Sequence, residues 1–169
     1  MRLAEGLLAL ISGLEEAQFA IGSVAPDSGI PDENWETFDP PAEVLHFQRD
    51  EDEAGKGQKR MCADLAFYRR YLAPLHPWQP ASPRFSFLLG YFFHLATDNL
   101  WSVEVGRPTR QRFAAEFEAD PKFIWQVKRD WYGLDFAYVR SHPDCIFWQV
   151  FMNAPGGSSV LDRTRGKPH

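Results

Sequence analysis

One segment in the middle of the chain constrains the fold more than any other feature. Ser82 and Pro83 favour a helix start, as cap and first-turn residue, and the sequence continues RFSFLLGYFFHLATDNLW. Apolar residues recur on nearly every side of such a helix, which is typical of a buried helix. The apolar run from Phe85 to Ala96 is shorter than the roughly 18 residues of a transmembrane helix. The segment therefore predicts a long, apolar central helix.

Helical spacing of apolar residues recurs on both sides of this segment, whereas no alternating pattern of convincing strand length occurs. The further predicted helices span 2–11, 14–21, 59–72, 109–119, 121–131, 134–140 and 143–153. We therefore expect an all-α fold with one multi-helix domain over residues 1–154. The Gly/Ser-rich and then basic tail, residues 155–169, is expected to be disordered.

Two polar segments interrupt the predicted helices. Residues 22–41 are rich in proline and glycine and form a long loop, and loops longer than about 12–15 residues in a compact domain are often functional. Residues 48–59 contain the charged run DEDEAGKGQK, which predicts a solvated surface insertion.

Charge and cysteine usage limit the partners and the location. The 169 residues carry a formal net charge of −5, so we expect neither a nucleic-acid patch nor an anionic membrane-binding face. Cys62 and Cys145 lack CxxC spacing, and we expect reduced thiols in helices. The apolar run Leu7–Ile11 is short and follows Glu5, so no signal peptide or transmembrane segment is visible and a cytoplasmic location is predicted. The oligomeric state stays open.

The central segment contains a histidine and a carboxylate that could share a metal ion. His94 and Asp98 are four residues apart, which places them on one helix face about one turn from each other. Their neighbours are apolar, so we expect both groups to face inward, where an unpartnered polar group is costly. A hydrogen-bonded core pair is the alternative to a metal site.

Asp27 and His46 extend this candidate site. Asp27 lies between Pro26 and Ser28-Gly29, which predicts a carboxylate on a tight turn. His46, in EVLHF, lies where the long loop re-enters the fold. Together with His94 and Asp98 they offer two imidazoles and two carboxylates, a set that suits zinc, manganese or iron. The alternatives are a turn-forming Asp27 and a packed loop histidine at His46.

The segments GSVAPDSGIP, EVLHF and FLLGYFFHLATDNLW resemble, in order and spacing, the metal-binding segments of the zinc-dependent phospholipase C family, whose fold is shared with fungal single-strand nucleases. The resemblance spans about Leu3 to Phe151. It implies an all-helical fold, one to three zinc ions and hydrolysis of a phosphodiester, with a phospholipid as the expected substrate. It also implies that Asp27, His46, His94 and Asp98 bind one zinc and that Asp98 bridges to another.

The other metal positions depart from the family's pattern. One family zinc uses the mature N-terminal amine and an early histidine, whereas the first histidine here is His46. We expect either a start upstream of this sequence or an incomplete site. Another family zinc uses a histidine where this chain has Glu104, and Asp130 and Asp135 are the later candidates. A site of three carboxylates would favour magnesium or manganese.

Two functions follow from these candidate ligands. The first is a metal-dependent phosphodiester hydrolase in which Asp27 is also catalytic, because it orients or deprotonates the attacking water. The second is a non-catalytic helical protein, a truncated family member, in which zinc ties the loops at Asp27 and His46 to the central helix. Four protein ligands would close such a site, whereas an open position favours the enzyme. The adjacent His-Asp pair of HD-type phosphohydrolases is absent from the sequence.

Overall fold

The computed structural model describes residues 2–34, 36–48, 61–120 and 122–153. Within these ranges the fold is all-α, as predicted, apart from one small antiparallel hairpin. Its strands, β1 (Ile30–Pro31) and β2 (Phe38–Asp39), lie inside the predicted loop and pair Ile30 with Asp39. The predicted tail and, apart from Gln48, the predicted charged insertion lie outside the described residues.

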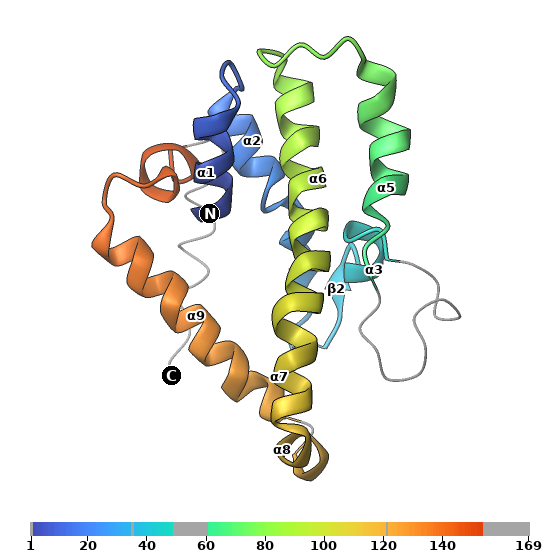
Figure 1. The fold of residues 1–169 in the computed structure, drawn as a ribbon, viewed down its shortest axis with the longest axis vertical. Coiled ribbons are helices and arrows are strands. Elements are labelled where there is room, and N and C mark those ends of the chain that lie inside the picture. Colours follow the sequence, from blue (N-terminus) through green and yellow to red (C-terminus); the bar gives the residue numbers. More distant parts are fainter. Residues whose placement is uncertain (1, 35, 49–60, 121, 154–169) are drawn as a thin grey trace.

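Helix α6 (Pro83–Trp101) is the central element of the fold. Ser82 caps it, since its hydroxyl oxygen accepts a hydrogen bond from the Phe85 amide. Figure 1 shows α6 along the middle of the molecule, with α1 (Arg2–Leu10) and α2 (Glu16–Gly22) on one side and α5 (Asp64–Phe67) on the other.

The prediction that this long helix is apolar nearly all round is wrong, since its buried residues are Phe85, Ser86, Gly90 and Leu95. Leu95 is fully buried, but Leu100 and Trp101, in the last turn, are 60% and 45% exposed. Among the described residues, none of the helices combines the length and the apolar character needed to cross a bilayer.

Two glycines bring the backbones of α2 and α6 into contact. A Cβ atom on Gly22 would lie 2.1 Å from the Phe87 carbonyl oxygen, and one on Gly90 would lie 2.3 Å from the Phe19 carbonyl oxygen. No side chain fits at such distances, so only glycine permits this helix crossing. The crossing holds Ser23, the residue that follows α2, against the middle of α6.

Two clusters of buried side chains attach α1, α2 and α5 to α6. One cluster joins α1, α2 and α6 to the segment after α5, and its buried members are Ala4, Leu14, Phe19, Leu72 and Phe85. A second cluster holds α5 against α6 and contains Cys62, Phe67 and Leu95. Both clusters place the middle of α6 between α2 and α5, where the candidate ligands lie.

The cysteines and the segments around α5 differ in part from the sequence prediction. Cys62 and Cys145 are buried reduced thiols, but neither lies in a helix, which corrects that expectation. Cys62 forms a β-bridge with Gln48 ahead of α5, and Cys145 lies in a bend. The helix predicted over 59–72 consists of α5 and the π-helical turn η2 (Tyr68–Leu72), followed by the 3₁₀ turn η3 (Ala73–Leu75).

The C-terminal half also differs in its helix boundaries. A π-helical turn, η4 (Ser102–Gly106), joins α6 to α7 (Arg107–Arg112), and Phe113 separates α7 from α8 (Ala114–Ala119). The two helices predicted over 121–140 form one helix, α9 (Phe123–Ser141), and the last predicted helix is reduced to the π-helical turn η5 (Phe147–Phe151).

The Glu5 carboxylate fixes the C-terminal segment to α1. It accepts hydrogen bonds from the Tyr138 hydroxyl at 2.8 Å and from the Ile146 amide at 2.9 Å. The far end of α9 is thereby held near α1, while its beginning lies near α8 (Figure 1). Helices α6 and α9 therefore diverge along the molecule.

Candidate metal centre

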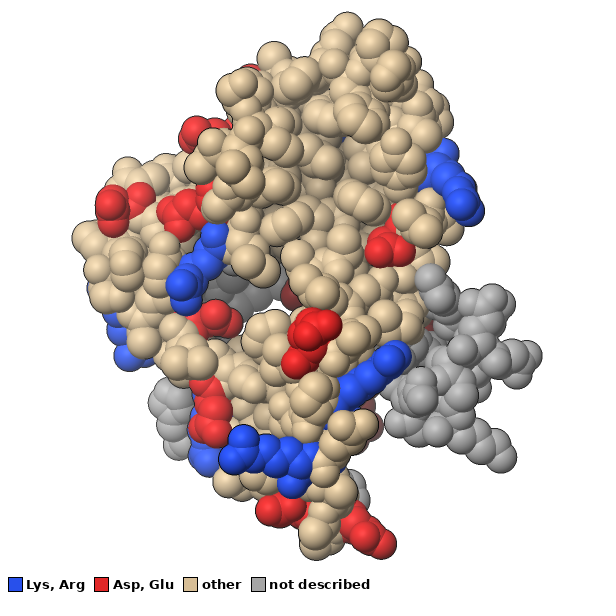
Figure 2. All heavy atoms as spheres, viewed as in Figure 1, with Lys and Arg blue, Asp and Glu red and all other residues tan. Residues whose placement is uncertain are grey.

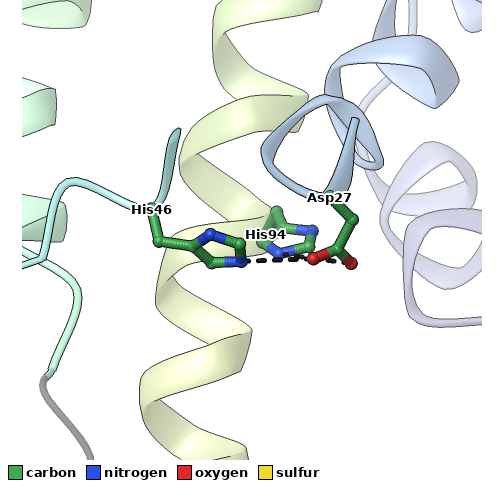
Figure 3. A group of neighbouring side chains, drawn as sticks. All are labelled: Asp27, His46 and His94. Atoms are coloured by element: carbon green, nitrogen blue, oxygen red, sulfur yellow. Dashed lines mark ion pairs between the residues drawn. The ribbon is translucent and has the colours of Figure 1, made fainter. Parts of the chain in front are cut away.

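Three of the predicted ligands meet beside α6, as Figure 3 shows. Asp27, His46 and His94 each offer one ligand atom, and these atoms all lie within 4.8 Å of one another. Asp27 ends the 3₁₀ turn η1 (Ala25–Asp27), His46 follows α3 (Ala42–Leu45), and His94 lies on α6. The fold therefore joins two predicted loop residues to the central helix.

The turn that carries Asp27 is tight, as its sequence predicts. Pro26 occupies the first turn of η1, and the Asp27 amide donates to the Val24 carbonyl at 3.0 Å. Pro26 is buried and fixes the turn, whereas the Asp27 side chain is 70% exposed. The carboxylate can therefore reach both the histidines and the solvent.

His46 is held at the end of α3 by several contacts. Its amide donates to the Ala42 carbonyl at 2.8 Å, and the Tyr91 hydroxyl of α6 donates to the carbonyl of Leu45. Phe47 follows with φ of 48°, a left-handed conformation that is uncommon outside glycine, and its ring packs on Phe67. This sharp turn leaves the His46 side chain only 12% exposed and facing α6.

Both histidines are oriented by backbone carbonyls. The Nδ1 atom of His46 lies 3.1 Å from the Ala42 oxygen, and Nδ1 of His94 lies 2.9 Å from the Ser23 oxygen. Because a carbonyl oxygen only accepts hydrogen bonds, each Nδ1 must carry the hydrogen. Each neutral ring then has its lone pair on Nε2. This is the arrangement found around metal-bound histidines, whose other nitrogen donates to a carbonyl or carboxylate.

The two Nε2 atoms converge on the Asp27 carboxylate. Nε2 of His46 lies 3.2 Å from Oδ1, and Nε2 of His94 lies 3.9 Å from Oδ2. The His94 Nε2 atom is buried and has no hydrogen-bond partner. Ligand atoms at about 2.0–2.1 Å from a tetrahedral zinc ion would be about 3.3 Å apart. The three ligand atoms, which lie within 4.8 Å of one another, are therefore close enough for a metal ion that draws them together by up to about 1.5 Å.

The carboxylates of this region raise the pKa of His46. The hydrogen bond to Asp27 is the main cause, the negative charges of Asp27 and Asp98 and the Ala42 carbonyl contribute, and burial opposes them. A proton on Nε2 therefore competes with a metal ion for the same position.

Helix α9 also lies within electrostatic reach of this centre. Partial burial, followed by the charges of Asp27 and Asp135, raises the pKa of Tyr132. The Asp27 carboxylate therefore influences a side chain far away in the sequence.

The other predicted ligands do not join this group of three. Asp98 is one turn along α6 from His94, and its charge acts on His46, but its oxygens are outside the group. Glu104 on η4 and Asp130 and Asp135 on α9 are exposed, and the structure places none of them within the group. Their roles as ligands stay predictions.

Several residues that position the centre have no ligand-type side chain, and sequence reasoning missed them. Ser23 acts through its carbonyl, and Tyr91 supports the residue before His46. Asn99 bonds both the amide and the carbonyl of Cys62, at 2.8 and 2.9 Å, and so ties the start of α5 to α6. Gly90, inside an otherwise apolar helix, was the available signal of a close approach.

No protein-family model, curated protein or solved structure matches the chain. The candidate metal centre therefore depends on the side chains and distances described above. Membership of the zinc-dependent phospholipase C family stays a prediction from the sequence.

Proposed function

We propose that this protein is a metal-dependent phosphodiester hydrolase in which Asp27, His46 and His94 bind the catalytic metal ion. The observation that carries this proposal is the convergence of two carbonyl-oriented Nε2 atoms and a carboxylate, with the His94 Nε2 buried and unpartnered. Leaving such an atom without a partner costs about 1–3 kcal/mol. Zinc suits the ligands, as do manganese and iron.

The number of ligands favours a catalytic over a structural metal. Structural zinc sites are usually closed by four protein ligands, whereas catalytic sites use three and leave one position for water or substrate. Among the described residues the group has three members, and Asp27 is 70% exposed. This supports the hydrolase more than the alternative of a zinc ion that only ties loops to α6.

A metal ion in such a site lowers the pKa of water and polarises a phosphoryl oxygen. The protein supplies fixed positions: the Ala42 and Ser23 carbonyls hold the imidazoles so that Nε2 needs no reorientation. With a metal ion bound, one Asp27 oxygen would hold it, and the other would orient the attacking water and accept its proton. A phosphodiester, with phospholipid as the expected form, is the substrate class that the sequence resemblance supports.

Metal content and hydrolysis test this proposal together. We would purify wild type, His94→Ala and the control His142→Ala, and measure metal per chain by plasma mass spectrometry. His142 is a matched control because its Nδ1 atom also lies close to a carbonyl oxygen, 2.9 Å from that of Tyr138. Unlike His94, His142 is exposed and is far in sequence from the residues of the metal centre. Release of 4-nitrophenol from bis(4-nitrophenyl) phosphate would then be followed in the same samples.

We expect bound zinc and hydrolysis in wild type and His142→Ala, and loss of both in His94→Ala. Zinc bound without any hydrolysis, either of this diester or of phosphatidylcholine vesicles, would refute the hydrolase and favour a structural site. Absence of metal from zinc-treated wild type would refute the centre itself.

A further inference from the structure

A pocket of about 430 Å³ lies at the lower end of α6, between that helix, η4, α7, α8 and α9. Trp101 of α6 lines the pocket and is seven residues beyond His94, a distance of about 10 Å along the helix. The pocket is therefore separate from the metal centre. Its volume falls in the range of about 300–1,000 Å³ that is typical of small-molecule sites.

The charge of the pocket contrasts with that of the whole chain. Arg107, Arg110 and Lys128 line it, whereas no aspartate or glutamate does, although the chain has a net charge of −5. None of the three cations has a carboxylate within ion-pair distance in the described part of the chain. Three uncompensated cations around a concave surface attract an anion.

The contacts that these cations do make are weak and leave their charge available. The Arg110 guanidinium lies 4.8 Å from the centre of the Phe117 ring, and the Lys128 ammonium lies 4.9 Å from that of Trp125. Arg107 approaches the Met61 sulfur at 4.0 Å. Figure 2 shows Lys and Arg side chains at the lower end of the molecule, where Asp and Glu side chains lie nearby but outside the pocket lining.

Aromatic rings form another part of the pocket wall. The indoles of Trp101 and Trp131 lie 5.4 Å apart and nearly perpendicular, at 87°, so that the edge of one meets the face of the other. Trp101 is 45% exposed and so presents part of its ring to a ligand. Indole surfaces stack well on planar rings such as nucleobases.

We propose that this pocket binds a small organic phosphate that carries a planar ring, such as a nucleoside monophosphate. Arg107, Arg110 and Lys128 hold the phosphate, because the planar guanidinium matches two phosphate oxygens at once. Trp101 and Trp131 contact the ring. The site does not depend on the metal centre or on hydrolysis.

Isothermal titration calorimetry with adenosine monophosphate tests this site. The decisive variant is Arg107→Gln/Arg110→Gln, and the matched control is Arg69→Gln/Arg70→Gln, which removes two exposed arginines from η2. We expect one nucleotide per chain in wild type and in the control, and binding weakened about tenfold or more in the pocket variant because charge-assisted hydrogen bonds are lost. His46→Ala should bind the nucleotide as wild type does.

Absence of binding at millimolar nucleotide, or equal weakening in the control, would overturn the proposal. Loss of binding in His46→Ala would overturn it as well, because the metal centre would then be the nucleotide site. If ribose 5-phosphate binds as tightly as the nucleotide, the role of the planar ring is wrong. If the pocket variant does not fold, NMR of the wild type tests the proposal instead. The indole N–H signals of Trp101 and Trp131 should both shift when nucleotide is added, and unchanged signals would overturn the proposal.

Discussion

Replacement of His94 by asparagine separates the metal centre from the fold more cleanly than replacement by alanine. The asparagine side-chain amide can still donate to the Ser23 carbonyl, which His94 Nδ1 approaches at 2.9 Å. The atom that is lost is Nε2, which is buried without a partner. His94→Asn therefore removes the metal ligand while it keeps the contact between α6 and the end of α2.

The two effects on the metal-free protein nearly cancel. Removal of the unpartnered nitrogen gains about 1–3 kcal/mol. Loss of the buried ring carbon Cε1 costs about 0.8 kcal/mol, and the polar asparagine oxygen, which takes the place of Cδ2, offsets a further part of the gain. We expect the free energy of unfolding in chelator to stay within about 1 kcal/mol of wild type. Zinc at about 100 times its dissociation constant stabilises a protein by about 2.7 kcal/mol. For a chain of this size that raises the wild-type Tm by about 5–11 °C, and His94→Asn should show no rise.

Thermal unfolding followed by circular dichroism, with zinc and with chelator, measures both quantities. His142→Asn is the matched control, since it makes the same chemical change at an exposed histidine and should keep the full zinc-dependent shift. A zinc-dependent rise in His94→Asn as large as that of wild type would remove His94 from the metal centre. Destabilisation of His94→Asn by several kcal/mol in chelator would show that Nε2 has a partner in the metal-free protein.

Three further perturbations test how the centre is held together. Gly90→Ala places a Cβ atom 2.3 Å from a carbonyl oxygen of α2 and should cost about 1–3 kcal/mol in urea unfolding, whereas Gly133→Ala on α9, with open space around it, should be neutral or stabilising. Asn99→Ala removes two hydrogen bonds to one backbone segment and should also cost about 1–3 kcal/mol, with weaker zinc binding measured by calorimetry. The pKa of His46 is raised by Asp27, so in chelator this contact stabilises the fold fully below pH 6.5, and the stabilisation disappears as the pH rises through the raised pKa. In urea unfolding across this pH range, His46→Gln should lack this pH-dependent part of the free energy of unfolding. The zinc affinity of the wild type should instead increase with pH, because the proton on His46 competes with zinc.

The central helix could be predicted because its signals are local. Ser82 and Pro83 define its start through cap chemistry, and its apolar residues define its length. The sequence predicts two helices where the structure has the single helix α9, which continues through Gly133, a glycine whose surroundings are open. Phe113 ends α7 with no proline or glycine at that position, so no local signal marks the boundary there.

The ligands could be predicted, but the groups that orient them could not. Asp27, His46 and His94 have side chains that bind metals, so residue type alone makes them candidates. The Ser23 and Ala42 carbonyls orient both imidazoles, and every residue has a carbonyl, so the sequence contains no sign of which one serves. Their selection results from the backbone approach of α2 and α6 at Gly22 and Gly90, which is a tertiary property.

Among the described residues, two locally unfavourable features both belong to this centre. Phe47, next to His46, adopts a φ of 48°, and the His94 Nε2 atom is buried without a hydrogen bond. Each feature costs about 1–3 kcal/mol, and unfavourable local conformations persist where the surrounding structure enforces them, most often at functional sites. A packed core offers no reason for both to occur around one carboxylate. A cation bound by Asp27, His46 and His94 gives a reason for both features. It would partner the two Nε2 atoms, and the turn at Phe47 would hold His46 in the position where it binds the cation.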